Sequence, residues 1–229
     1  MGQPNMVCFL DFDHTLFHTD QFFHIDLRYA FLRLGIDGAH WEQSYAAVWP
    51  TGYTLEKHVE EVSRQSGNQL PLEEMKRILQ DSFSDLRPYL FPDVLPFLQE
   101  AKKKSAHLYL LSFGHQEWQR YKVLASGLDC YFDDILFTAT EGGKGRLVHE
   151  QVKRDPQTVV VVVDNNPADL DAIRDLAPQI RTYCINRVPQ GARYPTDELS
   201  RLRFLEARQY LEKLPRHQHI PCRSLDSLL

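Results

Sequence analysis

Three short apolar runs in this chain end abruptly in polar residues. They lie at residues 7–10, 107–111 and 159–163, and the last consists of five valines. Continuous runs of this length, rich in Val and Leu, are typical of strands buried on both faces of a parallel sheet. Weaker runs at 135–138 and 180–185 predict two further strands. The pattern therefore predicts an α/β fold with a central parallel sheet.

The segment between the first two strands is too long for a single crossover helix, and it shows little β-branched alternation. Turn residues such as Gly35 and Gly52 divide it into helical stretches. The predicted helices are 20–34, 38–48, 54–66 and 71–83, followed by a returning helix at 93–104. We therefore predict a catalytic core formed by residues 1–17 and 88–229, and an inserted helical cap formed by residues 18–87.

The C-terminal region carries a weaker signal. Apolar residues recur at helical spacing within 197–214, which predicts an amphipathic helix packed on the core. The residues after it, with His217 and His219, are expected to form a loosely packed tail. Two histidines without nearby acidic or thiol partners are a weak metal signal.

Composition and charge exclude several classes of protein. With 43% apolar and 25% charged residues among 229, the chain can bury a sizeable core. A net charge of −5 argues against a general nucleic-acid binder. The four cysteines lack metal-ligand spacing and read as reduced thiols, and no apolar run approaches a membrane span. These features predict a soluble, cytoplasmic protein that binds neither nucleic acid nor membrane, and they predict no particular oligomeric state.

The polar residues at the strand ends are the candidates for chemistry, because open α/β sheets bind ligands beyond the carboxyl ends of their strands. Asp11 and Asp13 follow the first run directly. Two neighbouring carboxylates are costly unless a cation or a strained turn uses them. In phosphoryl transfer, one carboxylate can be the nucleophile, and the other can serve as general acid and base. The structural alternative is an acidic turn capped by Thr15.

The stretch at 9–17, FLDFDHTLF, resembles the first signature of the haloacid dehalogenase superfamily. That family's second signature is a Ser or Thr at the end of the next core strand, which Ser112 matches. The resemblance implies that the Ser112 hydroxyl and the backbone of Phe113 and Gly114 hold a phosphate oxygen. Taken alone, Ser112 would be an ordinary helix N-cap.

The remaining two signatures are a lysine and an acidic metal-binding segment. The resemblance implies that this lysine offsets the charge of the nucleophile and the phosphate. We assign the role to Lys144, with Lys153 as the alternative. Asp164 and Asn165 follow the five valines at the place of the acidic segment. The resemblance leaves open whether Asp164 or Asn165 binds the metal directly, with Asp169 supporting it. A turn that begins a helix is the alternative reading.

The resemblance implies a Rossmann-like three-layer sandwich and a Mg²⁺-dependent phosphatase that acts on a small phosphorylated metabolite. Asp11 would be the nucleophile and Asp13 the acid and base. The metal shell would contain Asp11, the Asp13 carbonyl and Asp164 or Asn165. Three alternatives stay open: a phosphomutase, a catalytically silent binding module, and a carbon–halogen hydrolase. Asp13 argues against the last, since the resemblance implies that such enzymes lack the second Asp and need no metal.

Overall fold

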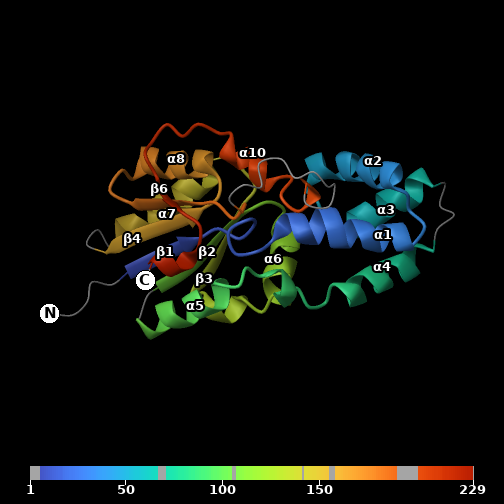
Figure 1. Ribbon diagram of the computed structural model, residues 1–229, viewed down its shortest axis with the longest axis horizontal. Helices are drawn as coiled ribbons and strands as arrows, with labels where there is room; N and C mark the ends of the chain where they lie inside the picture. Colours follow the sequence, from blue (N-terminus) through green and yellow to red (C-terminus); the bar gives the residue numbers. More distant parts are fainter. Residues whose placement is uncertain are drawn as a thin grey trace.

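Six parallel strands form one sheet with β1 near its centre. The structure is a computed structural model that describes residues 6–66, 71–104, 107–140, 142–154, 158–189 and 201–228 (Figure 1). The strands are β1 (Met6–Leu10), β2 (His107–Phe113), β3 (Asp134–Thr138), β4 (Val159–Asp164), β5 (Arg181–Ile185) and β6 (Ile220–Cys222). Their order is β3-β2-β1-β4-β5-β6. The predicted α/β sheet is confirmed, with a sixth strand added at one edge.

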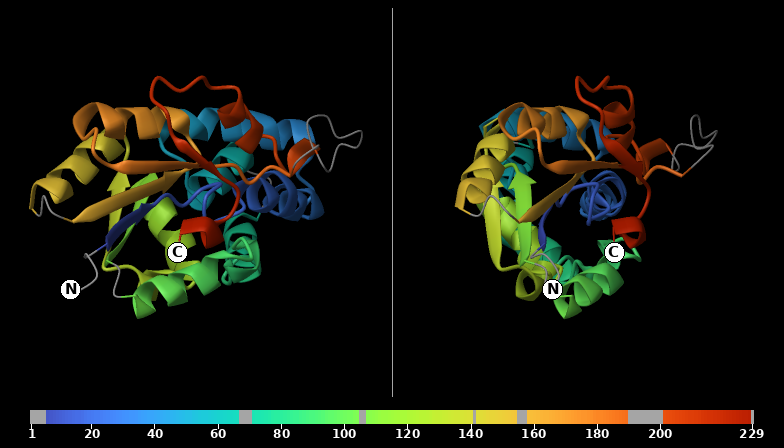
Figure 2. Two further views of the ribbon diagram at one scale, coloured as in Figure 1. Left: turned by 60° about the vertical axis from the view of Figure 1, so that its left-hand side comes forward. Right: turned by 90° about the vertical axis from the view of Figure 1, so that its left-hand side faces the viewer.

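Alternation along β1 divides the core between the two faces of the sheet. Phe9 packs against α7 (Gly143–Arg154) and α8 (Pro167–Leu176), together with residues of β4. Cys8 and Leu10 point to the opposite face, which α5 (Val94–Lys103) covers. Both faces are therefore apolar, which is why the strands read as unbroken hydrophobic runs. Two further views show the helices on either side of the sheet (Figure 2).

The order of the strands brings the predicted site residues together. β1 pairs with β2 on one side and with β4 on the other, in both cases in parallel. Asp11 follows β1, Ser112 lies near the end of β2, and Asp164 is the last residue of β4. Because the carboxyl ends of adjacent parallel strands meet at one edge, these residues become neighbours.

The insertion between β1 and β2 is helical, as predicted. It contains the π-helix η1 (Gln21–Leu27), α1 (Arg28–Arg33), α2 (Gly38–Val48), η2 (Trp49–Thr51), α3 (Leu55–Gln65) and α4 (Leu72–Ser82). Two of these helices are capped at their N-termini by side chains. Asp37 accepts a hydrogen bond from the His40 N–H at the start of α2, and Thr54 accepts one from the Lys57 N–H at the start of α3. Helices α1 to α4 gather at one end of the molecule, away from the sheet (Figure 1). The predicted cap borders fall before η1 and at the start of η3 (Arg87–Tyr89).

Cap and core share one continuous cluster of buried apolar residues. Trp118 on α6 (Gln116–Ala125) is the clearest link. Its ring lies 6.1 Å from that of Phe22 and 5.2 Å from that of Tyr53, both of which belong to the insertion. The hydroxyl of Tyr121 donates to the carbonyl of Phe83. The two parts are therefore joined by packing as well as by the chain.

The C-terminal region differs from its prediction. The predicted helix at 197–214 begins outside the described residues, and within them helical residues 201–202 are separated by a turn from the short helix α10 (Ala207–Leu211). The tail is not loosely packed, because β6 pairs with β5 and Leu225 is fully buried. His219 also has an acidic partner, Asp171 at 3.1 Å. None of the helices in the described residues is long and apolar enough to cross a membrane.

His58 provides a pH-dependent test of the cap. Its ring is fully buried and contacts the hydroxyls of Ser44 and Tyr53 at 2.9 and 3.1 Å. Burial lowers the pKa of His58 from 6.5 to about 4. The unfolded chain therefore takes up a proton before the folded chain, and stability falls as pH decreases through this window. We expect a loss of roughly 3 kcal/mol between pH 7 and pH 4 from this residue, measured by urea unfolding.

The matched variants are His58→Gln and His40→Gln, since His40 is exposed. His58→Gln should flatten the pH dependence, whereas His40→Gln should leave it unchanged. Equal pH dependence in His58→Gln and the unsubstituted chain would contradict this assignment.

Candidate active site

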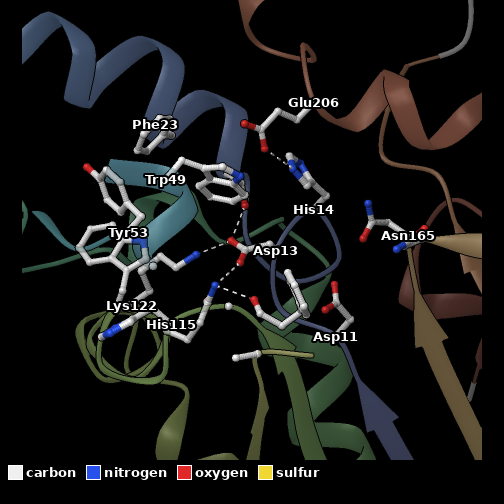
Figure 3. A pocket seen from close by; sticks show the side chains of 18 of the residues that line it. Asp11, Asp13, His14, Phe23, Trp49, Tyr53, His115, Lys122, Asn165 and Glu206 are labelled. Atoms are coloured by element: carbon white, nitrogen blue, oxygen red, sulfur yellow. Dashed lines mark hydrogen bonds and ion pairs between the residues drawn. The ribbon is translucent and has the colours of Figure 1, made fainter. Parts of the chain in front are cut away.

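A cavity of about 540 Å³ lies where the carboxyl ends of the central strands face the helical insertion. Asp11, Asp13, Lys144, Asp164 and Asn165 line it. The close-up shows Asp11, Asp13 and Asn165 around the cavity (Figure 3). The polar strand ends predicted from the sequence therefore converge on one site.

Lys144 is the centre of the site. Its Nζ lies 2.7 Å from Asp11 Oδ1, 2.7 Å from Asp164 Oδ2 and 3.2 Å from Asp169 Oδ2. The rival residue Lys153 is exposed. The structure therefore brings Lys144, and not Lys153, next to the predicted nucleophile.

Burial and charge shape the protonation of this group. Burial alone would lower the pKa of Lys144, but the three carboxylates raise it well above its ordinary value. Burial raises the pKa of Asp11 despite the opposing effect of Lys144. Burial and the charge of Asp11 raise the pKa of Asp164 well above its usual range. Three carboxyl groups, those of the buried Asp11 and Asp164 and the half-buried Asp169, thus share one ammonium, and acidic groups are in excess.

That excess fits a divalent cation. The donors are hard carboxylate oxygens, which Mg²⁺ prefers. Asn165 also lines the cavity, and its side-chain nitrogen has no hydrogen-bond partner in the described residues. The backbone N–H of Asn166 donates to Asp164 Oδ1 and fixes that carboxylate at the end of β4. Asp11, Asp164 and Asn165 can therefore hold the metal predicted from the sequence.

Asp13 lies in a different environment from Asp11. It forms an ion pair with Lys122 on α6, and it accepts hydrogen bonds from Thr19 Oγ1 at 2.7 Å and Gln119 Nε2 at 3.0 Å. Burial would raise the pKa of Asp13, but Lys122 and Thr19 hold it below its ordinary value. Asp11 and Asp13 are thus each paired with a different lysine, Lys144 and Lys122 respectively.

The predicted phosphate contacts divide into two groups. Phe113 and Gly114 line the cavity, whereas Ser112 is fully buried and its hydroxyl has no hydrogen-bond partner in the described residues. The N–H of Gly114 donates to the carbonyl of Thr138 at 2.9 Å. Because this N–H already donates a hydrogen bond within the protein, it is not available to bind an anion. The Ser112 hydroxyl is unpaired within the described residues, but Ser112 is not among the residues that line the cavity.

Sequence reasoning missed a second cluster beside the cavity. The Glu206 carboxylate lies 2.8 Å from His24 Nε2 and 3.4 Å from His14 Nε2. Asp20 accepts hydrogen bonds from the backbone N–H groups of Glu206 and Ala207. His14 itself adopts a φ of 60°, which a non-glycine residue seldom takes.

The ligand atoms of His14, Asp20 and Glu206 lie within 4.8 Å of one another, which is close enough for a metal ion. In the structure, however, these groups pair with each other and with backbone, and they fasten the segment around α10 to the cap. His14 is adjacent to Asp13 in sequence, but no local pattern announces Glu206, which lies 192 residues away.

Comparisons with known proteins agree with this geometry. Residues 6–177 match the family of haloacid dehalogenase-like hydrolases. Among curated proteins, none matches this sequence.

Solved structures resemble the whole chain at low identity. A haloacid dehalogenase-like hydrolase from Burkholderia xenovorans is 17% identical, with a TM-score of 0.69 over 99% of this chain and 95% of that one. The L-2-haloacid dehalogenase of Xanthobacter autotrophicus, with chloropropionic acid covalently bound, is 18% identical with a TM-score of 0.59, covering 99% and 97%. The magnesium-bound HAD hydrolase YfnB of Bacillus subtilis is 15% identical with a TM-score of 0.56, covering 99% and 97%. At these identities the likeness shows the fold.

The role of Lys144 in stability can be measured directly. Lys144→Met leaves three carboxylates, two of them buried, without their cation, so we expect the free energy of unfolding to fall by about 3 kcal/mol at pH 8. The loss should shrink toward pH 5, where the carboxylates can take up protons. Lys153→Met is the matched control and should change stability little. A Lys144→Met protein as stable as the control at pH 8 would contradict the arrangement.

Proposed function

The chain belongs to the family of haloacid dehalogenase-like hydrolases, and on that premise we propose that it is a Mg²⁺-dependent phosphatase of small phosphomonoesters. The observation that carries this proposal is the presence of Asp13 in the same cavity as Asp11, two residues later in the chain. A second carboxyl group at this place supplies what phosphoester hydrolysis needs, a proton for the leaving oxygen and a base for water.

In the proposed first step, an Asp11 carboxylate oxygen attacks phosphorus in line with the leaving oxygen. The bond from phosphorus to that oxygen breaks, and Asp13, which must first take up a proton from solvent because Lys122 and Thr19 hold its pKa low, donates that proton to the departing alcohol. In the second step, Asp13 takes a proton from water as the water attacks phosphorus. The Asp11–phosphorus bond then breaks and releases inorganic phosphate.

Other residues hold charge and position. Lys144, 2.7 Å from Asp11, would balance the charge of nucleophile and phosphate. The Ser112 hydroxyl would hold a phosphate oxygen. Mg²⁺ held by Asp11, Asp164, Asn165 and the Asp13 carbonyl would reduce the repulsion between carboxylate and phosphate. The cap covers the cavity and limits the access of bulk water.

Two rivals within the fold predict different products. A carbon–halogen hydrolase would release halide without a metal. Because the fold resembles that of a haloacid dehalogenase, the assays below include a test for halide release. A phosphomutase would return the phosphoryl group to the same substrate. A catalytically silent module would do neither, although Asp11, Asp13 and Lys144 line one cavity.

The first test is a release assay. We expect inorganic phosphate from at least one member of a panel of small phosphomonoesters with Mg²⁺, and loss of release with excess chelator. Asp11→Asn should lower kcat by at least about a thousandfold, because no nucleophile remains. Thermal unfolding of the variant checks that its fold is intact.

The same samples are assayed with 2-chloropropionate and chelator. Chloride release there, or phosphate release that survives in Asp11→Asn, would contradict the proposed reaction.

A substitution at Lys122 tests whether Asp13 is the general acid. Lys122→Met removes the cation that lowers the pKa of Asp13, while the burial that raises it remains. The Asp13 carboxyl should then keep its proton to higher pH. We expect the pH optimum of kcat/KM to move upward by at least about one pH unit. Lys103→Met, an exposed control, should keep the original profile. An unshifted profile in Lys122→Met would show that Asp13 is not the titrating acid.

A further inference from the structure

One wall of the cavity is aromatic and comes from the cap. Trp49 in η2 lines the cavity and is 57% exposed, which is high for a tryptophan. Its ring lies 5.7 Å from that of Tyr45, which lies 5.8 Å from Tyr53 and 4.8 Å from Phe23. Figure 3 shows Phe23, Trp49 and Tyr53 on one side of Asp13. Exposed apolar area of this kind inside a cavity indicates a bound group.

The other wall is anionic and comes from the C-terminal segment. Glu206 lines the cavity beside His14, and its side chain is 28% exposed. Figure 3 shows His14 and Glu206 pointing toward each other near Asp13. Burial would raise the pKa of Glu206, but the contacts with His14 and His24 hold it well below its ordinary value. Glu206 therefore remains a carboxylate in the working pH range.

Tyr210 adjoins the anionic wall, because its ring lies 5.8 Å from that of His14. Tyr45, Tyr210 and Glu206 all line the same cavity. A ligand of that cavity can therefore meet both the aromatic side chains and the Glu206 carboxylate.

The charge balance of the cavity selects the kind of ligand. Five carboxyl groups line it against the two ammonium groups of Lys122 and Lys144. His14 also lines it, and although burial would lower the pKa of His14, the contacts with Glu206 and Asp20 raise it. Acidic groups therefore still outnumber the basic ones. Binding a divalent cation together with a phosphate dianion leaves the net charge of the cavity unchanged, because their charges cancel. An anionic leaving group would be repelled, whereas a cationic one would reduce the excess.

We propose that the substrate is the phosphate ester of an alcohol that carries an alkylated ammonium group, which contacts Trp49 and Tyr45 and faces Glu206. This inference rests on the proposed phosphatase function. Aromatic faces attract weakly hydrated cations, and the attraction increases when the cation is desolvated. Asp13 would stand at the leaving oxygen, and His14, the next residue, contacts Glu206. The leaving alcohol would then lie in the cavity that His14 and Glu206 also line.

A pair of substrates that differ only in charge tests this inference. Phosphocholine and 3,3-dimethylbutyl phosphate have nearly the same shape, but only the first is cationic. We expect kcat/KM for phosphocholine to exceed that for the neutral ester by about tenfold or more. Because both values come from one enzyme preparation, their ratio cancels losses of active protein.

Two variants locate the source of the preference. Glu206→Gln removes the charge and keeps the shape, and Trp49→Leu removes the aromatic face. Each should reduce the ratio at least about threefold. The controls are Glu212→Gln, an exposed residue just after α10, and Tyr29→Leu, an exposed aromatic residue of α1. Both controls should keep the original ratio.

The outcomes separate the two proposals. Phosphate release from p-nitrophenyl phosphate with equal rates on the matched pair, or a preference for the neutral ester, would overturn the ammonium inference and leave the phosphatase standing. A preference unchanged in both Glu206→Gln and Trp49→Leu would overturn the assigned site. Release from none of these esters or the wider panel would overturn the phosphatase and this inference with it.

Discussion

The site depends on one buried ammonium group shared by three carboxylates. Lys144 lies at the start of α7, whereas Asp11 and Asp164 end adjacent strands. Buried charges are stable only when they are paired and hydrogen-bonded. The ends of β1 and β4 and the first turn of α7 must therefore stay in register with one another. The same contact leaves acidic groups in excess over the ammonium, which a divalent cation would offset.

Much of this arrangement was predictable because it follows from local pattern and topology. The valine run of β4 and the shorter run of β1 are apolar on both faces, so their strands and their parallel pairing follow from the sequence. Once they pair, the residues after them must meet. The sequence favoured Lys144 but left Lys153 as a rival, since both lie shortly before β4. The folding of both into α7 separates them, because the start of that helix faces Asp11 and Lys153 lies on its exposed side.

The missed residues have a common physical reason. Lys122 meets Asp13 across 109 positions, and Glu206 meets His14 across 192. No period of helix or strand encodes such contacts, which exist only after the sheet and cap have assembled. The C-terminal helix was predicted as one continuous stretch, but a turn separates residues 201–202 from α10, and two apolar positions behind the prediction, Leu205 and Leu211, are exposed. Strand β6 joins an edge of the sheet that the pattern left open.

The packing of Trp118 against Phe22 and Tyr53 restricts how the cap can move. A lid that swings away as a rigid unit would bring these rings into water, at about 2 kcal/mol for each large side chain exposed. Joined in this way, the cap is better suited to small adjustments around its rim than to wide opening. Substrate would then enter, and product would leave, past Trp49 and the chain segment that bears Glu206. Changes in that rim can alter which molecules enter without any change at the reacting carboxylates, so selectivity and chemistry are free to evolve separately.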